Sequence, residues 1–195
     1  MNKQSQNKDV MKRFTSKGVF PYQWAFTLLI PLRNIFLSPK KLIDRLALKE
    51  DHYVMELGPG PGYFSLQVAK RLTKGKLVLV DIQPEMLDYA SKRIQKKGLS
   101  NVEYHLCSGE RFEFQDDVFD RIFMVTVIGE VENKESYLRE FHRMLKKDGI
   151  LSISEQAGDP DKMTSDEIRH LAEQYGFGFD QFYGSESNYT INFRK

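Results

Sequence analysis

The sequence ELGPGPGYFS, at residues 56–65, places three glycines between an apolar run and a helical pattern. The run at residues 53–57 has the composition of a buried strand, and residues 63–72 carry apolar side chains at helical spacing. Glycine at 58, 60 and 62 removes side chains that would keep a ligand from the backbone, and it permits the positive φ of a tight turn. A strand, a glycine turn and a helix in this order predict the ligand-binding edge of a doubly wound sheet.

Strand and helix patterns alternate along the rest of the chain, which is typical of βαβ units and a parallel sheet. Thr164 with Glu167 forms a capping-box signature for a late helix. We expect strands at residues 53–57, 76–82, 102–108, 119–125, 150–156, 177–183 and 188–194, and helices at 63–72, 84–97, 134–145 and from 164. The predicted fold class is therefore α/β: a doubly wound, Rossmann-like, seven-stranded, mostly parallel sheet with a C-terminal antiparallel hairpin and a helical N-terminal extension.

The 195 residues suit one domain with an added segment rather than two full-sized domains. Residues 1–49 hold ten Lys and Arg against two acids, a net charge of +8, so the remaining residues carry −6 to give the total of +2. We predict a helical extension at 1–49, acting as a lid or docking segment, and a ligand-binding domain at 50–195. Pro31, Arg33 and Asn34 interrupt the apolar part of the extension before it reaches the roughly 20 residues of a membrane span.

Two acids accompany the glycine turn. Glu56 ends the strand before it, and Asp81 ends the next strand in LVLVDI, where a carboxylate can accept hydrogen bonds from both hydroxyls of a ribose. Three other interpretations of the turn are weaker. A P-loop would need Lys and Ser or Thr where Tyr63 and Phe64 stand, a dinucleotide fingerprint would need glycine at position 63, and a purely structural turn leaves both acids unexplained.

Four motifs in order resemble the class I S-adenosylmethionine-dependent methyltransferases, particularly the branch of the ubiquinone and menaquinone biosynthesis methylases. They are ELGPGPG, VDIQPEML, NVEYHLCSGERFEFQDDVFDRIFM and LKKDGILSISE, and the resemblance covers residues 53–155. It implies S-adenosyl-L-methionine as the cofactor. By that resemblance Glu56, Gly58, Gly60 and Gly62 hold its methionine portion, Asp81 holds the ribose, Ile82 and Met86 sandwich the adenine, Ser108 and Gly109 lie beside the adenine, and Val125 and Thr126 border the methyl donor.

One position departs from this family's pattern. The family usually has Asp at the position of Ser108, where it contacts the adenine amine. Serine weakens that contact here, or leaves it to Glu110. The departure from the family's pattern therefore concerns the adenine end of the predicted site.

Methyl transfer from a sulfonium is an in-line displacement that needs no dedicated base, and the sequence assigns none. We expect all four histidines (His52, His105, His142 and His170) to be structural, so the catalytic residue stays unassigned. The aromatic residues Tyr22 and Trp24 of the extension are candidate substrate contacts, or they dock the extension on the domain. Cys107 is the only cysteine, so we expect no cysteine-based metal site, no disulfide and a reducing, cytoplasmic location.

The expected partner is a small, partly apolar methyl acceptor. Nucleic acid is not expected, because the loop after the fourth strand reads VTVIGEVEN and lacks the Asn/Asp-Pro-Pro-aromatic motif of base methylases. Basic and aromatic residues in 1–49 also suit peripheral contact with an anionic membrane. The alternative function is a non-catalytic module that binds S-adenosylmethionine and uses the extension as a docking arm. The sequence leaves the oligomeric state and the methylated atom undetermined.

Overall fold

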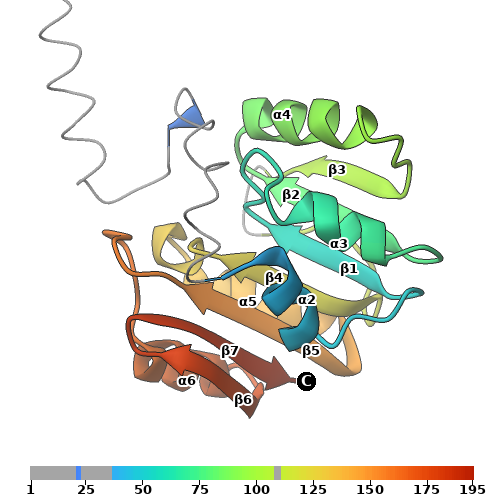
Figure 1. The fold of residues 1–195 in the computed structure, drawn as a ribbon. Helices are drawn as coiled ribbons and strands as arrows, with labels where there is room; N and C mark the ends of the chain where they lie inside the picture. Colours follow the sequence, from blue (N-terminus) through green and yellow to red (C-terminus); the bar gives the residue numbers. More distant parts are fainter. Residues whose placement is uncertain (1–20, 23–36, 108–110) are drawn as a thin grey trace, which may run out of the picture.

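The computed structural model describes residues 21–22, 37–107 and 111–195, which contain one seven-stranded sheet (Figure 1). The strands follow the spatial order β3-β2-β1-β4-β5-β7-β6. Their bounds are β1 Tyr53–Leu57, β2 Lys76–Asp81, β3 Val102–Leu106, β4 Phe119–Val125, β5 Leu145–Glu155, β6 Gly178–Ser185 and β7 Asn188–Arg194. The predicted number of strands is confirmed.

Strand directions also match the prediction. β1 pairs in parallel with β2 and β4, β2 with β3, and β4 with β5. β7 pairs antiparallel with both β5 and β6, which makes the C-terminal hairpin. The order reverses at β1, because the chain proceeds outward to β3 and then returns to place β4 on the other side of β1. Open α/β sheets bind ligands at such a switch point, beyond the carboxyl ends of the strands.

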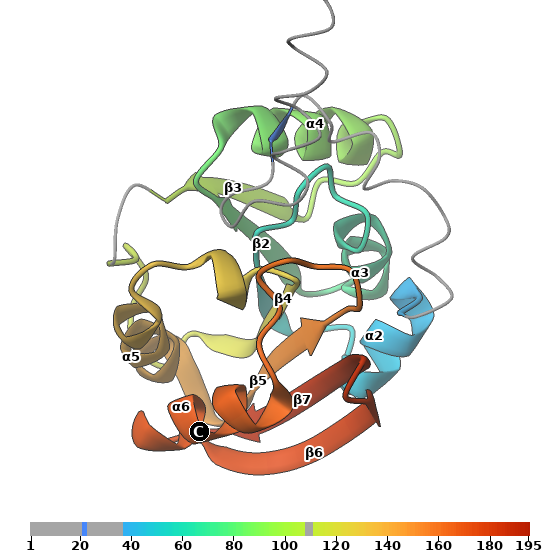
Figure 2. The ribbon, with the colours of Figure 1, turned by 90° about the vertical axis from the view of Figure 1, so that its left-hand side faces the viewer.

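Helices cover both faces of the sheet (Figure 2). On one face α2 (Pro39–Arg45), α3 (Ser65–Arg71) and α4 (Pro84–Gln95) bury Leu42, Val68 and Ala90 against it. On the other, α5 (Lys134–Met144) and α6 (Ser165–Gln174) bury Phe141 and Ile168. A short 3₁₀ helix, η3 (Ile128–Glu130), follows β4. Burial on both sides explains why the parallel strands read as nearly continuous apolar runs.

Local signals set most helix bounds. Pro84 begins α4, where its missing N–H costs nothing, and Met86, Leu87, Ala90 and Ile94 form the buried face as predicted. The predicted capping box at α6 is present: the Glu167 amide donates to Thr164 Oγ1, and the Glu167 carboxylate accepts from the Thr164 amide at 2.8 Å.

Several predicted bounds were wrong, among them the end of α4, which is Gln95 rather than residue 97, and the end of β6, which is Ser185 rather than residue 183. β5 begins at Leu145, not at residue 150, because Leu145 already pairs with Phe119 and the Asp148 turn, with φ of 63°, forms an irregularity inside the strand. The helix after the glycine turn begins at Ser65, not at residue 63, because the turn continues through residues 60–64. β3 ends at Leu106 rather than at residue 108.

The end of the predicted extension docks on the sheet domain. Leu42 and Leu46 are fully buried in the core beneath α2, as expected from their spacing. The Arg45 guanidinium donates to Thr190 Oγ1 at 2.7 Å, and Arg121 Nε donates to the Leu46 carbonyl at 2.7 Å. These contacts join residues 37–49 to β4 and β7. In the described part of the chain, no helix has the length and apolar character needed to cross a membrane.

Candidate functional site

The glycine turn lies where the sequence places it, between the carboxyl end of β1 and the start of α3. Gly58, Gly60 and Gly62 all have positive φ, at 62°, 53° and 77°. The Gly58 amide donates to the Val80 carbonyl at 2.8 Å, which holds the turn beside the end of β2. The turn therefore lies next to the predicted ribose acid, Asp81.

Gly58 is required by space as well as by conformation. A Cβ at this position would lie 2.6 Å from Val127 Cγ2, on the segment that follows β4. The Val127 side chain, on the loop after β4, thus packs directly against the Gly58 backbone. This close contact joins the two halves of the candidate site.

We expect Gly58→Ala to lower the free energy of unfolding by about 2 to 4 kcal/mol, from the positive φ and the contact with Val127 together. Gly98→Ala is the matched control, because Gly98 also has a positive φ, of 71°, but its Cβ would meet no atom within 4 Å. That variant should lose only about 1 kcal/mol. Urea denaturation of both variants makes the comparison, and equal losses would contradict the role of Val127.

Glu56 is a buried carboxyl with one unsatisfied oxygen. Its side chain is 3% exposed, and Oε2 has no hydrogen-bond partner among the described residues. Burial is the main cause that raises the pKa of Glu56 to about 8, with the nearby Ser65 hydroxyl acting to lower it and the Asp81 charge acting to raise it. An unsatisfied buried polar atom is costly, so this oxygen indicates a place where a ligand can donate a hydrogen bond.

Asp81 lies on the same face of the sheet as Glu56, at the end of the neighbouring strand. Its carboxylate is 7% exposed and accepts the Gln83 amide at 2.9 Å. Burial raises the pKa of Asp81, while hydrogen bonds from the amides of Gln83, Gly60 and Ile82 oppose that effect. The side chain is thus fixed in place at the edge where the glycine turn begins.

The residues predicted to contact adenine lie in different environments. Ile82 is 49% exposed beside Asp81, whereas Met86 is buried on α4. Leu106 was missed by the sequence analysis: it pairs with Asp81 in the β2–β3 register and is 56% exposed. Two exposed apolar side chains next to a buried acid form an apolar surface at the ends of β2 and β3. The sequence shows Leu106 only as an apolar residue at the end of β3. Its position beside Asp81 follows from the β2–β3 register.

Val125 and Thr126 end β4 as predicted. Val125 packs against the core beneath α2, α3 and α4. Thr126 has a positive φ of 55°, its amide donates to the Ser154 carbonyl at 2.8 Å, and its hydroxyl donates to the Val125 carbonyl at 2.7 Å. Left-handed backbone at a threonine is strained, and such strain is concentrated at functional sites.

Several predicted residues add nothing to this geometry. Trp24, Ser108 and Gly109 lie outside the described residues. Tyr22 is described and half-buried. The extension's predicted roles as lid, substrate contact and membrane contact therefore stay predictions.

The four histidines make structural contacts away from the glycine turn. His52 is buried before β1, its Nδ1 accepts from the Lys49 amide at 3.4 Å, and burial lowers its pKa. His105 lies against Phe114, and His142 against Phe177. His170 contacts Gln174 on the α6 helix at 3.0 Å. The structural role of the histidines therefore stays a prediction, and the catalytic residue stays unassigned.

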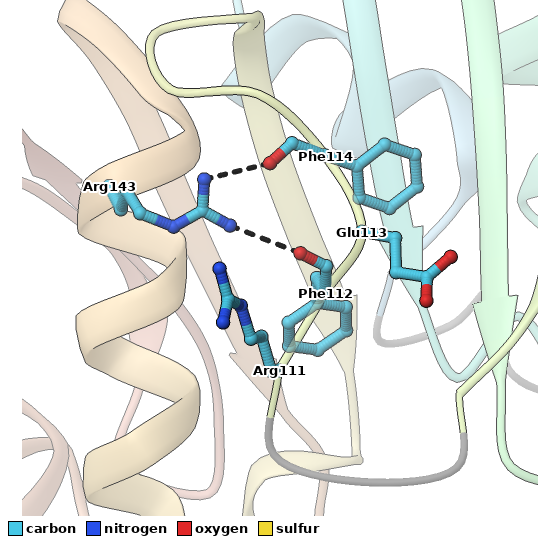
Figure 3. Close-up of a pocket in the computed structure, with 5 residues that line it drawn as sticks. All are labelled: Arg111, Phe112, Glu113, Phe114 and Arg143. Atoms are coloured by element: carbon cyan, nitrogen blue, oxygen red, sulfur yellow. Dashed lines mark hydrogen bonds between the residues drawn. The ribbon is translucent and has the colours of Figure 1, made fainter.

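A pocket elsewhere in the molecule is lined by Arg111, Phe112, Glu113, Phe114 and Arg143 (Figure 3). The Arg143 guanidinium donates to the carbonyls of Phe112 and Phe114, at 3.1 and 2.7 Å, and forms ion pairs with Glu140 and Asp116. These bonds tie the segment before β4 to α5. The pocket contains none of the predicted site residues, so we assign it a structural role.

Relatives of this chain are methyltransferases. Over 115 residues it is 30% identical to the ubiquinone/menaquinone biosynthesis C-methyltransferase UbiE of Hydrogenovibrio crunogenus, covering 58% of this chain and 45% of that protein. Over 110 residues it is 29% identical to (S)-coclaurine N-methyltransferase of Thalictrum flavum subsp. glaucum, covering 56% and 30%. The chain spans about half, or less, of the length of these curated relatives.

Solved structures agree on the fold. A SAM-dependent methyltransferase from Aquifex aeolicus superposes with a TM-score of 0.84 at 24% identity, covering 90% of this chain and 98% of that one. Phosphoethanolamine N-methyltransferase 2 of Haemonchus contortus, in complex with S-adenosyl-L-methionine, gives a TM-score of 0.72 at 15% identity, covering 91% and 60%.

The family model described as "Methyltransferase domain" matches residues 48–184, which is more than half of the 195 residues. The site described above, with its glycine turn and two strand-end acids, falls inside that match. The chain therefore belongs to the methyltransferase-domain family, which confirms its predicted resemblance to the class I S-adenosylmethionine-dependent methyltransferases.

Proposed function

We propose that this protein transfers a methyl group from S-adenosylmethionine to a small, partly apolar acceptor by in-line displacement. The observation that carries the proposal is the buried, unsatisfied Glu56 Oε2 beside Asp81, at neighbouring strand ends around the glycine turn. This arrangement offers two acidic acceptors beside the glycine turn, within one edge of the sheet.

The residues present suit the chemical groups of the cofactor. The Glu56 oxygen can accept a hydrogen bond from the amine of the methionine portion, and the Asp81 carboxylate can accept from the ribose hydroxyls. Within the turn, the backbone of Gly58 and Gly60 is partly exposed and carries no side chain, whereas Gly62 is buried against Ala90. When bound, the cofactor supplies a methyl group already activated by attachment to a sulfonium.

The remaining predicted contacts are part of the same proposal. Ile82 would line the adenine site from its exposed position, and Leu106 would add to that apolar surface. Met86 is buried on α4 and would support the site from behind. Val125 and Thr126 would border the methyl group, and Ser108, Gly109, Tyr22 and Trp24 keep their predicted roles as proposals.

The protein's contribution to the reaction would be alignment and exclusion of water. Correct orientation of two reactants contributes up to about 7 to 11 kcal/mol to lowering a barrier. The strained Thr126 backbone, fixed by its bond to the Ser154 carbonyl, gives a rigid wall at the end of β4. We assign no catalytic base.

The nature of the acceptor is open between carbon and nitrogen nucleophiles. UbiE is named as a C-methyltransferase of quinone biosynthesis, and the coclaurine enzyme is named as an N-methyltransferase. The predicted cytoplasmic location and the peripheral membrane contact stay predictions.

Turnover tests this function. The purified protein is incubated with S-adenosylmethionine and separate panels of quinols, phenols and amines, and S-adenosylhomocysteine is quantified by mass spectrometry. We expect its formation only when an acceptor is present, and expect Asp81→Ala to lower its rate at subsaturating cofactor by at least about tenfold. Tight cofactor binding with no transfer to any member of the panels would favour the non-catalytic binding module instead.

A further inference from the structure

Glu155, the last residue of β5, is a buried carboxyl without hydrogen bonds. Its side chain is 1% exposed, and neither Oε1 nor Oε2 has a hydrogen-bond partner among the described residues. Nearly all buried polar side chains in proteins are paired, so a carboxyl with both oxygens unsatisfied calls for a missing partner. The sequence analysis gave Glu155 no role.

Glu155 lies at the same edge of the sheet as the proposed site but on the opposite face. Val125 pairs with Ser154, and the Thr126 amide donates to the Ser154 carbonyl, so Glu155 follows directly after the contact with the end of β4. By strand alternation its side chain shares a face with Ile153, in the core beneath α5 and α6. Glu56 and Asp81 share the other face, with Val54 and Leu79. A ligand at Glu155 would therefore be distinct from the cofactor.

Most charges around Glu155 are negative. Asp159, Glu130 and Asp161 act on it with the same sign, and Lys162 opposes them. The Lys162 ammonium, however, donates to the Glu186 and Ser187 carbonyls and lies 5.4 Å from the Tyr189 ring centroid. Burial, with these acidic neighbours, raises the pKa of Glu155 to about 8. At neutral pH Glu155 therefore carries a proton, and its acidic neighbours favour a positive charge beside its carboxyl group.

Two segments close over this carboxyl. Gly129 in η3 approaches the 159–163 segment so closely that a Cβ there would lie 1.9 Å from the Asp161 carbonyl oxygen. Tyr189 on β7 is the register partner of Glu155, and its hydroxyl donates to the Met163 carbonyl at 2.6 Å. The Tyr189 ring already has the Lys162 ammonium over it, 5.4 Å from the ring centroid, and stacks on Phe182. The site is therefore enclosed by η3, β7 and the segment that follows β5.

We propose that Glu155, with Asp159, Glu130 and Asp161 around it, binds a protonated amine of the methyl acceptor. This inference rests on the proposed function and specifies the class of its acceptor. An ammonium can donate hydrogen bonds to both unsatisfied oxygens and supplies the positive charge that the acidic neighbours favour. A metal ion is the less suitable occupant, because the described residues contain no group of three or more side chains placed to hold one.

Methylammonium chloride is the probe, and the ionisation of Glu155 is the readout. The full-length protein, labelled with ¹³C at glutamate carboxyls, is titrated with pH by NMR with and without the probe, and Glu155→Gln identifies the resonance. We expect methylammonium to lower the pKa of Glu155 by at least about one unit, which corresponds to roughly tenfold tighter binding to the carboxylate than to the acid. Potassium chloride at the same concentration controls for ionic strength. Tetramethylammonium chloride at the same concentration tests whether a positive charge without N–H donors has the same effect.

Two variants test the electrostatic argument. Asp159→Asn removes the neighbouring charge with the largest effect on Glu155, so it should lower the Glu155 pKa and weaken methylammonium binding to the ionised carboxylate severalfold. Glu113→Gln, an exposed acid in the segment before β4, should change neither quantity. The Asp159 variant also keeps the test valid in the event that Glu155→Gln fails to fold.

Three results would overturn the proposal. They are a Glu155 pKa unchanged by methylammonium, a change that potassium reproduces, and unaltered methylammonium binding in Glu155→Gln. Calorimetric binding of S-adenosylhomocysteine to Glu155→Gln separates this failure from failure of the proposed function. If S-adenosylhomocysteine binds but methylammonium does not, only the amine site is contradicted. If the wild type does not bind S-adenosylhomocysteine, the proposed function itself is contradicted.

Discussion

Replacement of Asp81 by alanine should weaken the binding of S-adenosylhomocysteine by at least tenfold, a loss of about 1.4 kcal/mol or more. The carboxylate is buried, and the Gln83 amide fixes it at 2.9 Å. Hydrogen bonds to a charged group contribute about 1.5 to 3 kcal/mol each, and the ribose offers two hydroxyls. Isothermal titration calorimetry with the purified variant measures the effect.

Asp88→Ala is the matched control for this variant. Asp88 is an exposed acid on α4 that pairs with Lys92, so its replacement makes the same change in charge nearby without touching the candidate site. We expect its affinity for S-adenosylhomocysteine to stay within about twofold of wild type, because exposed ion pairs contribute little. Equal weakening in the two variants, or unchanged affinity in a folded Asp81→Ala, would show that Asp81 does not hold the ribose.

The second large effect is a loss of stability with rising pH. Glu56 and Glu155 both have a pKa raised to about 8 in the folded protein, whereas an unfolded glutamate has its ordinary value near 4.5. Between those values the folded state binds more protons than the unfolded state, so the free energy of unfolding falls as pH rises. Each group contributes a slope of up to about 1.4 kcal/mol per pH unit, and its stabilisation is fully present only below the unfolded pKa.

Urea denaturation at pH 5.5 and 7.5 tests this dependence in wild type, Glu56→Gln and Glu155→Gln. Each substitution should remove up to about 3 kcal/mol of the difference between the two pH values. Burial lowers the pKa of His52 and His142, which makes stability rise with pH through the unfolded histidine value. Comparing each variant with wild type cancels that opposing contribution. An unchanged difference in both variants would mean that neither carboxyl is neutral in the folded protein.

The fold could be predicted from the sequence because its signals are local. Apolar runs of strand length, the Pro84 start and the Thr164 capping box each depend on residues near one another in the chain. The irregularity at Asp148 was missed, because an Asp-Gly pair in a sequence can mark either a turn between two elements or a bulge inside one strand. Only the pairing of Leu145 with Phe119, which is distant in sequence, shows that Asp148 lies inside β5.

The candidate site could be predicted only in part. The glycine turn and the two strand-end acids were visible because motif spacing defines them. The approach of Val127 to Gly58, the exposure of Leu106 and the unsatisfied oxygens of Glu155 depend on how separate strands and loops meet. Glu155 in particular reads in sequence as an ordinary polar end to a strand, and its burial becomes visible only when η3 and the 159–163 segment are placed over it.

The most direct test of the proposed cofactor site is a calorimetric titration of the wild-type, full-length protein with S-adenosylhomocysteine. We expect saturable one-to-one binding with a Kd in the micromolar range, which corresponds to a binding free energy of about −8 kcal/mol. The absence of binding in a sample shown to be folded would contradict it, because Glu56, the glycine turn and Asp81 would then not form a cofactor site.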